Sequence, residues 1–61
     1  MKYEIFHEHK VWHKGEVQRI TVFRLQTAST EFSRLMRQPG TLYVKLFENN
    51  KLIAQFCANG I

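Results

Sequence analysis

The sequence predicts an α+β fold in a single domain over residues 1–61: a four-stranded antiparallel sheet with one helix packed on one face. Three observations predict it. Runs rich in β-branched and aromatic residues lie on both sides of a helix candidate. The helix candidate is amphipathic and stops at Pro39-Gly40. A two-residue Asn49-Asn50 loop then separates the last two runs. The element order is therefore β-β-α-β-β.

The first half of the chain is typical of a hairpin. Strands are expected over Lys2–Trp12 and Glu16–Leu25, the second with the sequence EVQRITVFRL. Gly15 lies in the connecting HKGE segment, where glycine can take the left-handed conformation that a short loop with a bulge requires. Trp12 adjoins this loop, and it either caps one end of the core or anchors a partner.

We expect the helix over Ala28–Gln38. Thr27 is its predicted N-cap, and Glu31 lies in the first turn, where a negative charge complements the helix dipole. The apolar residues recur at helical spacing and indicate the face that meets the core. These residues are Ala28, Phe32, Leu35 and Met36. Arg34 and Arg37 point away from that face, toward the C-terminal end where cations suit the dipole.

The last two strands are expected over Thr41–Glu48 and Lys51–Ala58. A two-residue loop implies a type I′ turn, which needs a positive φ at both positions, and Asn tolerates it. The turn sets the register and divides the hairpin into two faces. One face pairs Glu48 with Lys51, Leu46 with Ile53, Val44 with Gln55 and Leu42 with Cys57. The other pairs Phe47 with Leu52, Lys45 with Ala54 and Tyr43 with Phe56.

Only one of these faces can lie under a single helix. The aromatic face (Tyr43, Phe47, Leu52, Ala54, Phe56) carries only Lys45 as a polar residue, and the small Ala54 leaves room for a helix. We therefore expect the aromatic face to be the core. The aliphatic strip (Leu42, Val44, Leu46, Ile53) is then left on the surface, where it marks a site of binding or self-association.

Composition narrows the class of protein. The net charge is +4, from nine Lys and Arg against five Glu, which is compatible with an anionic partner. The single Cys57 cannot form an internal disulfide. No apolar run approaches the roughly 18 residues that span a membrane, and the N-terminus has no signal-peptide core. We expect a reducing, cytoplasmic location.

The residues offer little catalytic chemistry. His7 and His9 share one face of a strand and can chelate a metal, but spacing places no further ligand, so no metal, cofactor or catalytic residue is predicted. The same histidines, with His13 and the glutamates, are the residue types of an acid–base nuclease. A third interpretation is a single-stranded nucleic-acid platform, which needs an open aromatic face. Its members are Tyr43, Lys45, Phe47 and Phe56.

Three segments of the chain form a specific pattern. They are a Trp-Xaa-Lys-Xaa-Glu type turn, here WHKGE at residues 12–16, an ITVFR strand at residues 20–24 and the C-terminal hairpin YVKLFENNKLIAQFCANG. In their order and spacing they resemble the Dmd (discriminator of mRNA degradation) antitoxins of T-even-type bacteriophages, and the resemblance is closest in the hairpin. The positions of that hairpin that fit are Val44, Lys45, Phe47, Lys51 and Gly60. The match fades across the helix, where Glu31 and Gly40 differ in type from the family's contact residues.

The resemblance implies a non-enzymatic inhibitor in the cytoplasm of an infected bacterium. It would bind an endoribonuclease toxin of the RnlA or LsoA type, block its active-site cleft and protect phage mRNA. The expected partner is thus a protein rather than nucleic acid or a membrane. A single-stranded nucleic-acid binder is the alternative, and the spare face or Cys57 can also make a homodimer. The expected partner-binding residues are Glu31, Arg34, Arg37, Leu42, Val44, Leu46, Ile53 and Gln55.

Overall fold

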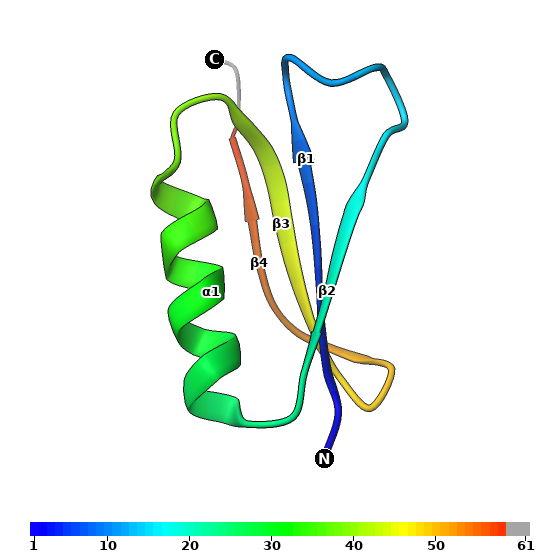
Figure 1. The fold of residues 1–61 in the computed structure, drawn as a ribbon, viewed down its shortest axis with the longest axis vertical. Helices are drawn as coiled ribbons and strands as arrows, with labels where there is room; N and C mark the ends of the chain where they lie inside the picture. The colour runs from blue at the N-terminus through cyan, green and yellow to red at the C-terminus, as the bar shows by residue number, and fades with distance from the viewer. Residues whose placement is uncertain (59–61) are drawn as a thin grey trace.

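A computed structural model describes residues 1–58 of the chain and contains one helix and four strands within them (Figure 1). The strands are β1 (Tyr3–His9), β2 (Gln18–Val22), β3 (Thr41–Glu48) and β4 (Lys51–Cys57), and the helix is α1 (Leu25–Arg37). The order β-β-α-β-β is as predicted. Gly60, one position of the antitoxin resemblance, lies outside the described residues.

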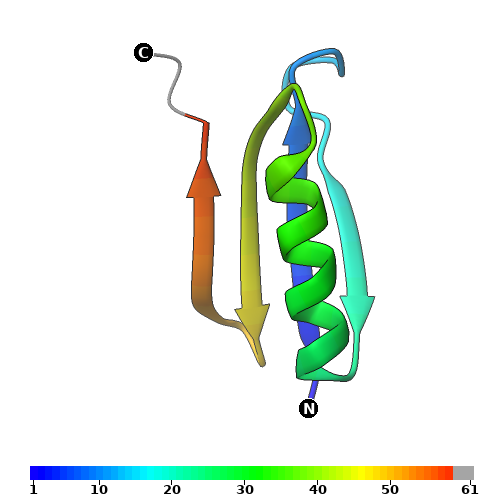
Figure 2. The same cartoon turned by 90° about the vertical axis from the view of Figure 1, so that its left-hand side faces the viewer.

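The four strands form one antiparallel sheet in the order β2-β1-β3-β4. The two hairpins therefore meet through their first strands, and β1 and β3 occupy the centre. Helix α1 packs along β1 and β3 on one face of the sheet, and β4 extends beyond it (Figure 2). The predicted α+β arrangement, a four-stranded antiparallel sheet with one helix packed on one face, is confirmed. Helix α1 is too short and too polar to cross a membrane.

The core lies between α1 and the two central strands. Its buried apolar side chains come from β1, α1 and β3, and Ile5, Ala28 and Val44 have no exposed surface. The remaining buried apolar residues are Tyr3, Leu35 and Leu46. Partly buried side chains close the rim: Ile20, Val22, Phe32, Ala54 and Phe56. Burying one Leu or Ile side chain, as in this set, stabilises a fold by about 1.5–3 kcal/mol.

The covered face is the opposite of the predicted one. Val44 and Leu46 of the aliphatic strip lie under α1, and the expectation that the aromatic face forms the core is wrong. The reason lies in β1, which pairs with β3 along its whole length. Its covered side carries Tyr3, Ile5 and His7, whereas Glu4 and Glu8 fall on its other side with Phe6. Burying two carboxylates under the helix would be costly, so the face without them becomes the core.

A β-bulge at Ile53 changes the predicted pairing of the last hairpin. Asn49 and Asn50 have φ values of 49° and 72°, which confirms the predicted positive φ at both turn positions. Beyond the turn, Glu48–Lys51 and Phe47–Leu52 pair as expected. The extra residue then shifts every later pair. The pairs become Leu46–Ala54, Lys45–Gln55, Val44–Phe56 and Tyr43–Cys57, which moves Ala54 and Phe56 to the helix side.

The helix begins three residues before the predicted start. Strand β2 ends at Val22, and Phe23 and Arg24 alone connect it to the helix layer. Arg24 is the N-cap without a side-chain hydrogen bond, and its carbonyl accepts the Ala28 N–H at 3.0 Å. Thr27 is therefore inside the helix rather than at its cap, and Glu31 lies beyond the first turn. The C-terminal end is set by Pro39, because a residue before proline, here Gln38, favours extended backbone.

The first hairpin is shorter in its strands and longer in its loop than predicted. Strand β1 stops at His9, β2 starts at Gln18, and residues 10–17 connect them. The Trp12 N–H donates to the His9 carbonyl at 3.1 Å, which turns the chain back at once. Gly15 has a φ of 89°, as a left-handed turn residue. Trp12 is therefore a loop residue, and its ring lies 5.1 Å from that of His7, where it caps the histidine end of the core.

Candidate functional site

The sheet face opposite α1, here called the open face, carries rings and charges in a regular grid. Cross-strand pairs share a face, so the register assigns its members. One row runs Arg19, Phe6, Lys45 and Gln55 across all four strands. The rows on either side contain Glu8, Tyr43 and Cys57, and Thr21, Glu4, Phe47 and Leu52. In Figure 1 no helix lies on this side of the sheet.

Three half-buried aromatic rings form the centre of the open face. Phe6 and Phe47 meet edge to face, with 5.5 Å between ring centroids. The ammonium of Lys45 lies 5.3 Å from the centroid of the Tyr43 ring, within the range of a cation–π contact. These residues, with Val17 and Arg19, line a shallow hollow of about 450 Å³. The open face is therefore neither a flat apolar patch nor a purely charged one.

The carboxylates of the open face already have partners. Glu4 lies 3.8 Å from Arg19 and 4.0 Å from Lys2. Glu8 accepts a hydrogen bond from the Gly15 N–H at 3.2 Å. Burial, with the Glu8 carboxylate as a second cause, raises the pKa of the Tyr43 hydroxyl. Lys45 forms no ion pair within residues 1–58, which leaves its positive charge available beside the rings.

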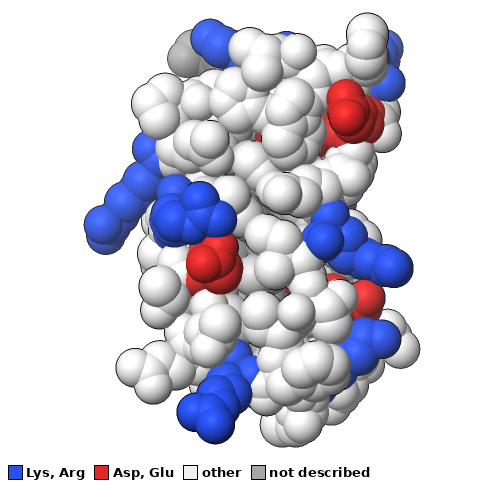
Figure 3. All heavy atoms as spheres, in the orientation of Figure 1, with Lys and Arg blue, Asp and Glu red and all other residues white. Residues whose placement is uncertain are grey.

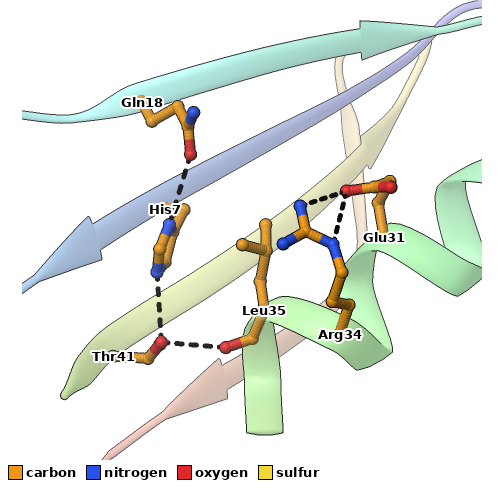
Figure 4. Close-up of polar contacts among 6 residues, drawn as sticks. All are labelled: His7, Gln18, Glu31, Arg34, Leu35 and Thr41. Carbon is orange, nitrogen blue, oxygen red and sulfur yellow. Dashed lines mark hydrogen bonds and ion pairs between the residues drawn. The ribbon is translucent and has the colours of Figure 1, made fainter. Parts of the chain in front are cut away.

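His7 is the one buried histidine, and its hydrogen bonds make it part of the core (Figure 4). The Thr41 hydroxyl donates its only hydrogen to the Leu35 carbonyl at 2.8 Å. It must therefore accept from the Nε2–H of His7, 3.1 Å away. Burial lowers the pKa of His7 below its ordinary 6.5, and a neutral ring leaves Nδ1 as an acceptor. Gln18, with Oε1 placed 3.5 Å from Nδ1, satisfies it when the amide is turned to present its NH₂ group.

His9 is also committed to backbone contacts. Its Nδ1 accepts the Val11 N–H at 3.2 Å, and its Nε2 lies 2.8 Å from the Pro39 carbonyl. The His7 and His9 rings are 6.3 Å apart, and Trp12 lies against both. Both nitrogens of each ring thus serve the fold. Among residues 1–58, no three His, Cys, Asp or Glu side chains are grouped so that they can hold a metal ion.

The outer surface of α1, here called the helix ridge, is the second exposed feature. Its side chains line a shallow hollow of about 740 Å³ and are Gln26, Ser29, Thr30, Ser33, Arg34 and Arg37. The Arg34 guanidinium pairs with Glu31, with Nε 3.1 Å from the carboxylate (Figure 4). On the side of the molecule seen in Figure 3, Lys and Arg side chains lie over both the helix and the strands rather than in one patch.

The predicted partner-binding residues fall into three groups. Val44 and Leu46 are buried and cannot contact a partner without loss of the core. Arg34, Arg37, Leu42, Ile53 and Gln55 are exposed, and Glu31 is half-buried in its pair with Arg34. Residues of the open face that sequence reasoning missed are Phe6 and Arg19. The Glu-Phe-Glu alternation of β1, at residues 4, 6 and 8, was the signal that could have found them.

Comparison with known proteins found no family model, no curated protein and no solved structure that matches this chain.

Proposed function

We propose that the protein is an antitoxin that binds a bacterial endoribonuclease toxin of the RnlA or LsoA type and blocks its active-site cleft, so that phage mRNA is protected. The similarity of the WHKGE turn, the ITVFR strand and the C-terminal hairpin to Dmd antitoxins supports this toxin class. In this proposal the protein acts in the cytoplasm of the infected bacterium and performs no chemistry itself. His7 and His9 accord with that role, since their nitrogens are occupied in the fold.

The main support for a protein-binding role is the composition of the helix ridge. The small side chains Ser29, Thr30 and Ser33 lie along its length and let a partner backbone approach closely. Arg34 and Arg37 stand at its C-terminal end, and arginine is enriched in protein interfaces because its guanidinium offers several directed donors. None of these side chains is needed for the buried core, so the ridge is free to match a partner.

The charge of the protein bears on how it would fit the toxin. An inhibitor that imitates RNA would be acidic, whereas this chain carries a net charge of +4. Complementary shape and apolar contact must then provide the affinity, with charge setting orientation. Leu42 and Ile53, each 41% exposed, are the apolar members of the predicted partner set that remain on the surface.

Co-expression with an RnlA-type or LsoA-type toxin tests the proposal. We expect rescue of bacterial growth and a complex that co-purifies. Arg37→Glu with Thr30→Trp on the helix ridge should abolish both, because the first reverses a charge and the second fills the hollow. Lys10→Glu, an exposed charge reversal in the β1–β2 loop outside the WHKGE turn, is the control and should retain rescue. A wild-type chain that neither rescues growth nor co-purifies with either toxin would contradict the proposal.

The edge of β4 is where we expect self-association. Strand β4 has one sheet neighbour only, and Leu52, Ile53 and Cys57 on it are exposed. A second copy could pair along this edge, with a mass of twice 7.3 kDa. Light scattering over a range of concentrations, with and without reductant, measures it. A monomer mass under every condition would rule the dimer out.

A further inference from the structure

We propose that the open face binds single-stranded nucleic acid, with bases stacked on Phe6, Tyr43 and Phe47 and phosphates held by Arg19 and Lys45. This activity lies on the opposite side of the molecule from the helix ridge and does not depend on toxin binding. Three solvent-accessible rings on a sheet are the arrangement on which successive bases stack, because every base has a π-face.

The register places a cation on each side of the central ring. Arg19 of β2 and Lys45 of β3 are the direct cross-strand neighbours of Phe6. Neighbouring strands lie about 4.8 Å apart, so both cations are one strand away from a base stacked on that ring. Arg19 is 64% exposed at its side chain and Lys45 has no carboxylate partner within residues 1–58. A phosphate on either side of the base therefore finds a positive charge.

The mixture of rings and charges favours nucleic acid over a second copy of the chain. Two open faces packed together would bury Arg19, Lys45, Glu4 and Glu8 twice, and each ion removed from water costs several kcal/mol unless it is paired with good geometry. A nucleic acid supplies an apolar face for the rings and a negative charge for the cations. The glutamates repel it only weakly, since the ammonium of Lys2 lies 4.0 Å from the Glu4 carboxylate and Glu8 accepts a hydrogen bond from the Gly15 amide.

The same geometry selects single strands. In a duplex the bases are stacked on one another, and their faces cannot reach Phe6 or Tyr43. A single strand exposes these faces and can bend to follow the shallow hollow between Phe6, Tyr43 and Phe47. Stacking on rings and charge attraction to phosphates, the two contacts assigned to this face, predict little discrimination among sequences.

Fluorescence anisotropy of the full chain with a labelled RNA of about 10 nucleotides tests this site. With two phosphates neutralised, the slope of log K against log salt should be about −1.4 between about 50 and 200 mM salt. Lys45→Gln should reduce the magnitude of that slope by about 0.7. Arg34→Gln removes the same charge from α1, and it should leave the slope unchanged.

The contribution of the Phe6 ring is tested by a second set of variants, in which Phe6→Leu is matched by the control Phe23→Leu. Phe6→Ala should weaken binding roughly 5- to 150-fold, and Phe6→Leu, which keeps an apolar side chain in place, should weaken it in the same direction. Phe23→Leu is the control, because Phe23 is 69% exposed but lies between β2 and α1. Circular dichroism confirms that each variant is folded.

Three results would overturn the proposal. One is no binding by the wild type at the lowest salt. Another is equal affinity for a duplex of the same length. The third is an equal effect of Lys45→Gln and Arg34→Gln on the salt slope, or an equal effect of Phe6→Leu and Phe23→Leu on the affinity. Either result would mean that the charge of the whole protein attracts RNA. Because Phe6→Leu leaves both the helix ridge and the segments that resemble Dmd antitoxins intact, it should still bind toxin, so failure of one proposal is separable from failure of the other.

Discussion

The covered and open faces of the sheet are made by neighbouring residues of the same strands, yet the first is fully buried at its centre and the second only half-buried. Ile5 and Val44 have no exposed surface, whereas Phe6 and Lys45, the next residues along each strand, face away from the helix. The covered face holds mainly aliphatic side chains, with Tyr3, Phe56 and the hydrogen-bonded His7 among them. The open face holds rings, cations and partnered carboxylates. A chain of 61 residues can thus build its core and the proposed binding surface on the same two central strands.

This difference teaches that apolar content alone does not identify a core. The open face is rich in aromatic residues, yet each ring has a charged residue beside it across the sheet. The covered face has fewer aromatic rings but almost no charge. What decides the helix position is the cost of burying ionised groups, which exceeds the gain from burying one more ring.

The largest expected effect separates the two faces by stability. Ile5→Ala removes a side chain at the centre of the core and should cost about 2–5 kcal/mol. A chain of this length has a total stability of about 3–9 kcal/mol, so the variant should be largely or partly unfolded. Phe6→Leu, one residue away on the open face, should cost less than about 1.5 kcal/mol. Urea denaturation followed by circular dichroism measures both, and equal losses would break the comparison.

Substitutions of two glycines test whether the His9 ring is packed against the backbone at Gly40. Gly40 has a φ of 90°, and a Cβ there would collide with the His9 ring; Gly15 has a φ of 89° with open space around it. Gly40→Ala should therefore cost on the order of 2 kcal/mol, and Gly15→Ala about 1 kcal/mol from backbone strain alone. Thermal melting gives the two values. If Gly15→Ala is the more damaging variant, the packing of His9 against Gly40 is refuted.

The pH dependence of stability tests the buried state of His7. Its pKa is lowered mainly by burial, and the neighbouring His9 and Arg34 lower it further. Between that lowered value and 6.5 the unfolded chain binds more protons than the folded one, so stability falls as the pH drops through this window. Above 6.5 the contribution is fully present. The slope should be visible in urea midpoints measured from about pH 7.5 to pH 5.

Matched histidine variants isolate that slope. His7→Gln keeps a side chain that can donate to Thr41 but removes the titration, so it should flatten the pH dependence. His13→Gln changes a histidine that is exposed in the loop and should keep the dependence of the wild type. A slope that survives His7→Gln and vanishes in His13→Gln would place the titrating group in the loop instead.

The smallest expected effect concerns the β3–β4 turn, which holds both faces in register. Asn50 has a φ of 72°, a conformation that glycine adopts without strain, whereas the Asn49 side chain accepts the Lys2 N–H at 3.1 Å. Asn50→Gly should thus stabilise the protein by roughly 0.5 kcal/mol. Asn49→Gly should destabilise it through loss of that hydrogen bond. Differential melting of the two variants decides the matter.

Much of the fold was predictable because local patterns determine it. The Asn49-Asn50 turn, the bounds of β3 and the stop at Pro39 follow from residue types alone. Which face of the sheet is covered by the helix was not predictable from local patterns, because it depends on which strand lies beside β3. The bulge at Ile53 reverses the sides of Ala54 and Phe56, and no residue type in this hairpin signals it. The candidate platform lost Phe56 for that reason, and it gained Phe6 because β1 pairs with β3 and places Phe6 beside Lys45.

The ring signals of an NMR titration with single-stranded RNA test the division between the two faces most directly. The protein has rings on both faces, so one spectrum contains its own control. We predict that the signals of Phe6, Tyr43 and Phe47 shift as RNA is added, whereas those of Phe32 and Phe56 on the helix side stay in place. Shifts confined to Phe32 and Phe56, or no shift of any ring at low salt, would contradict the account.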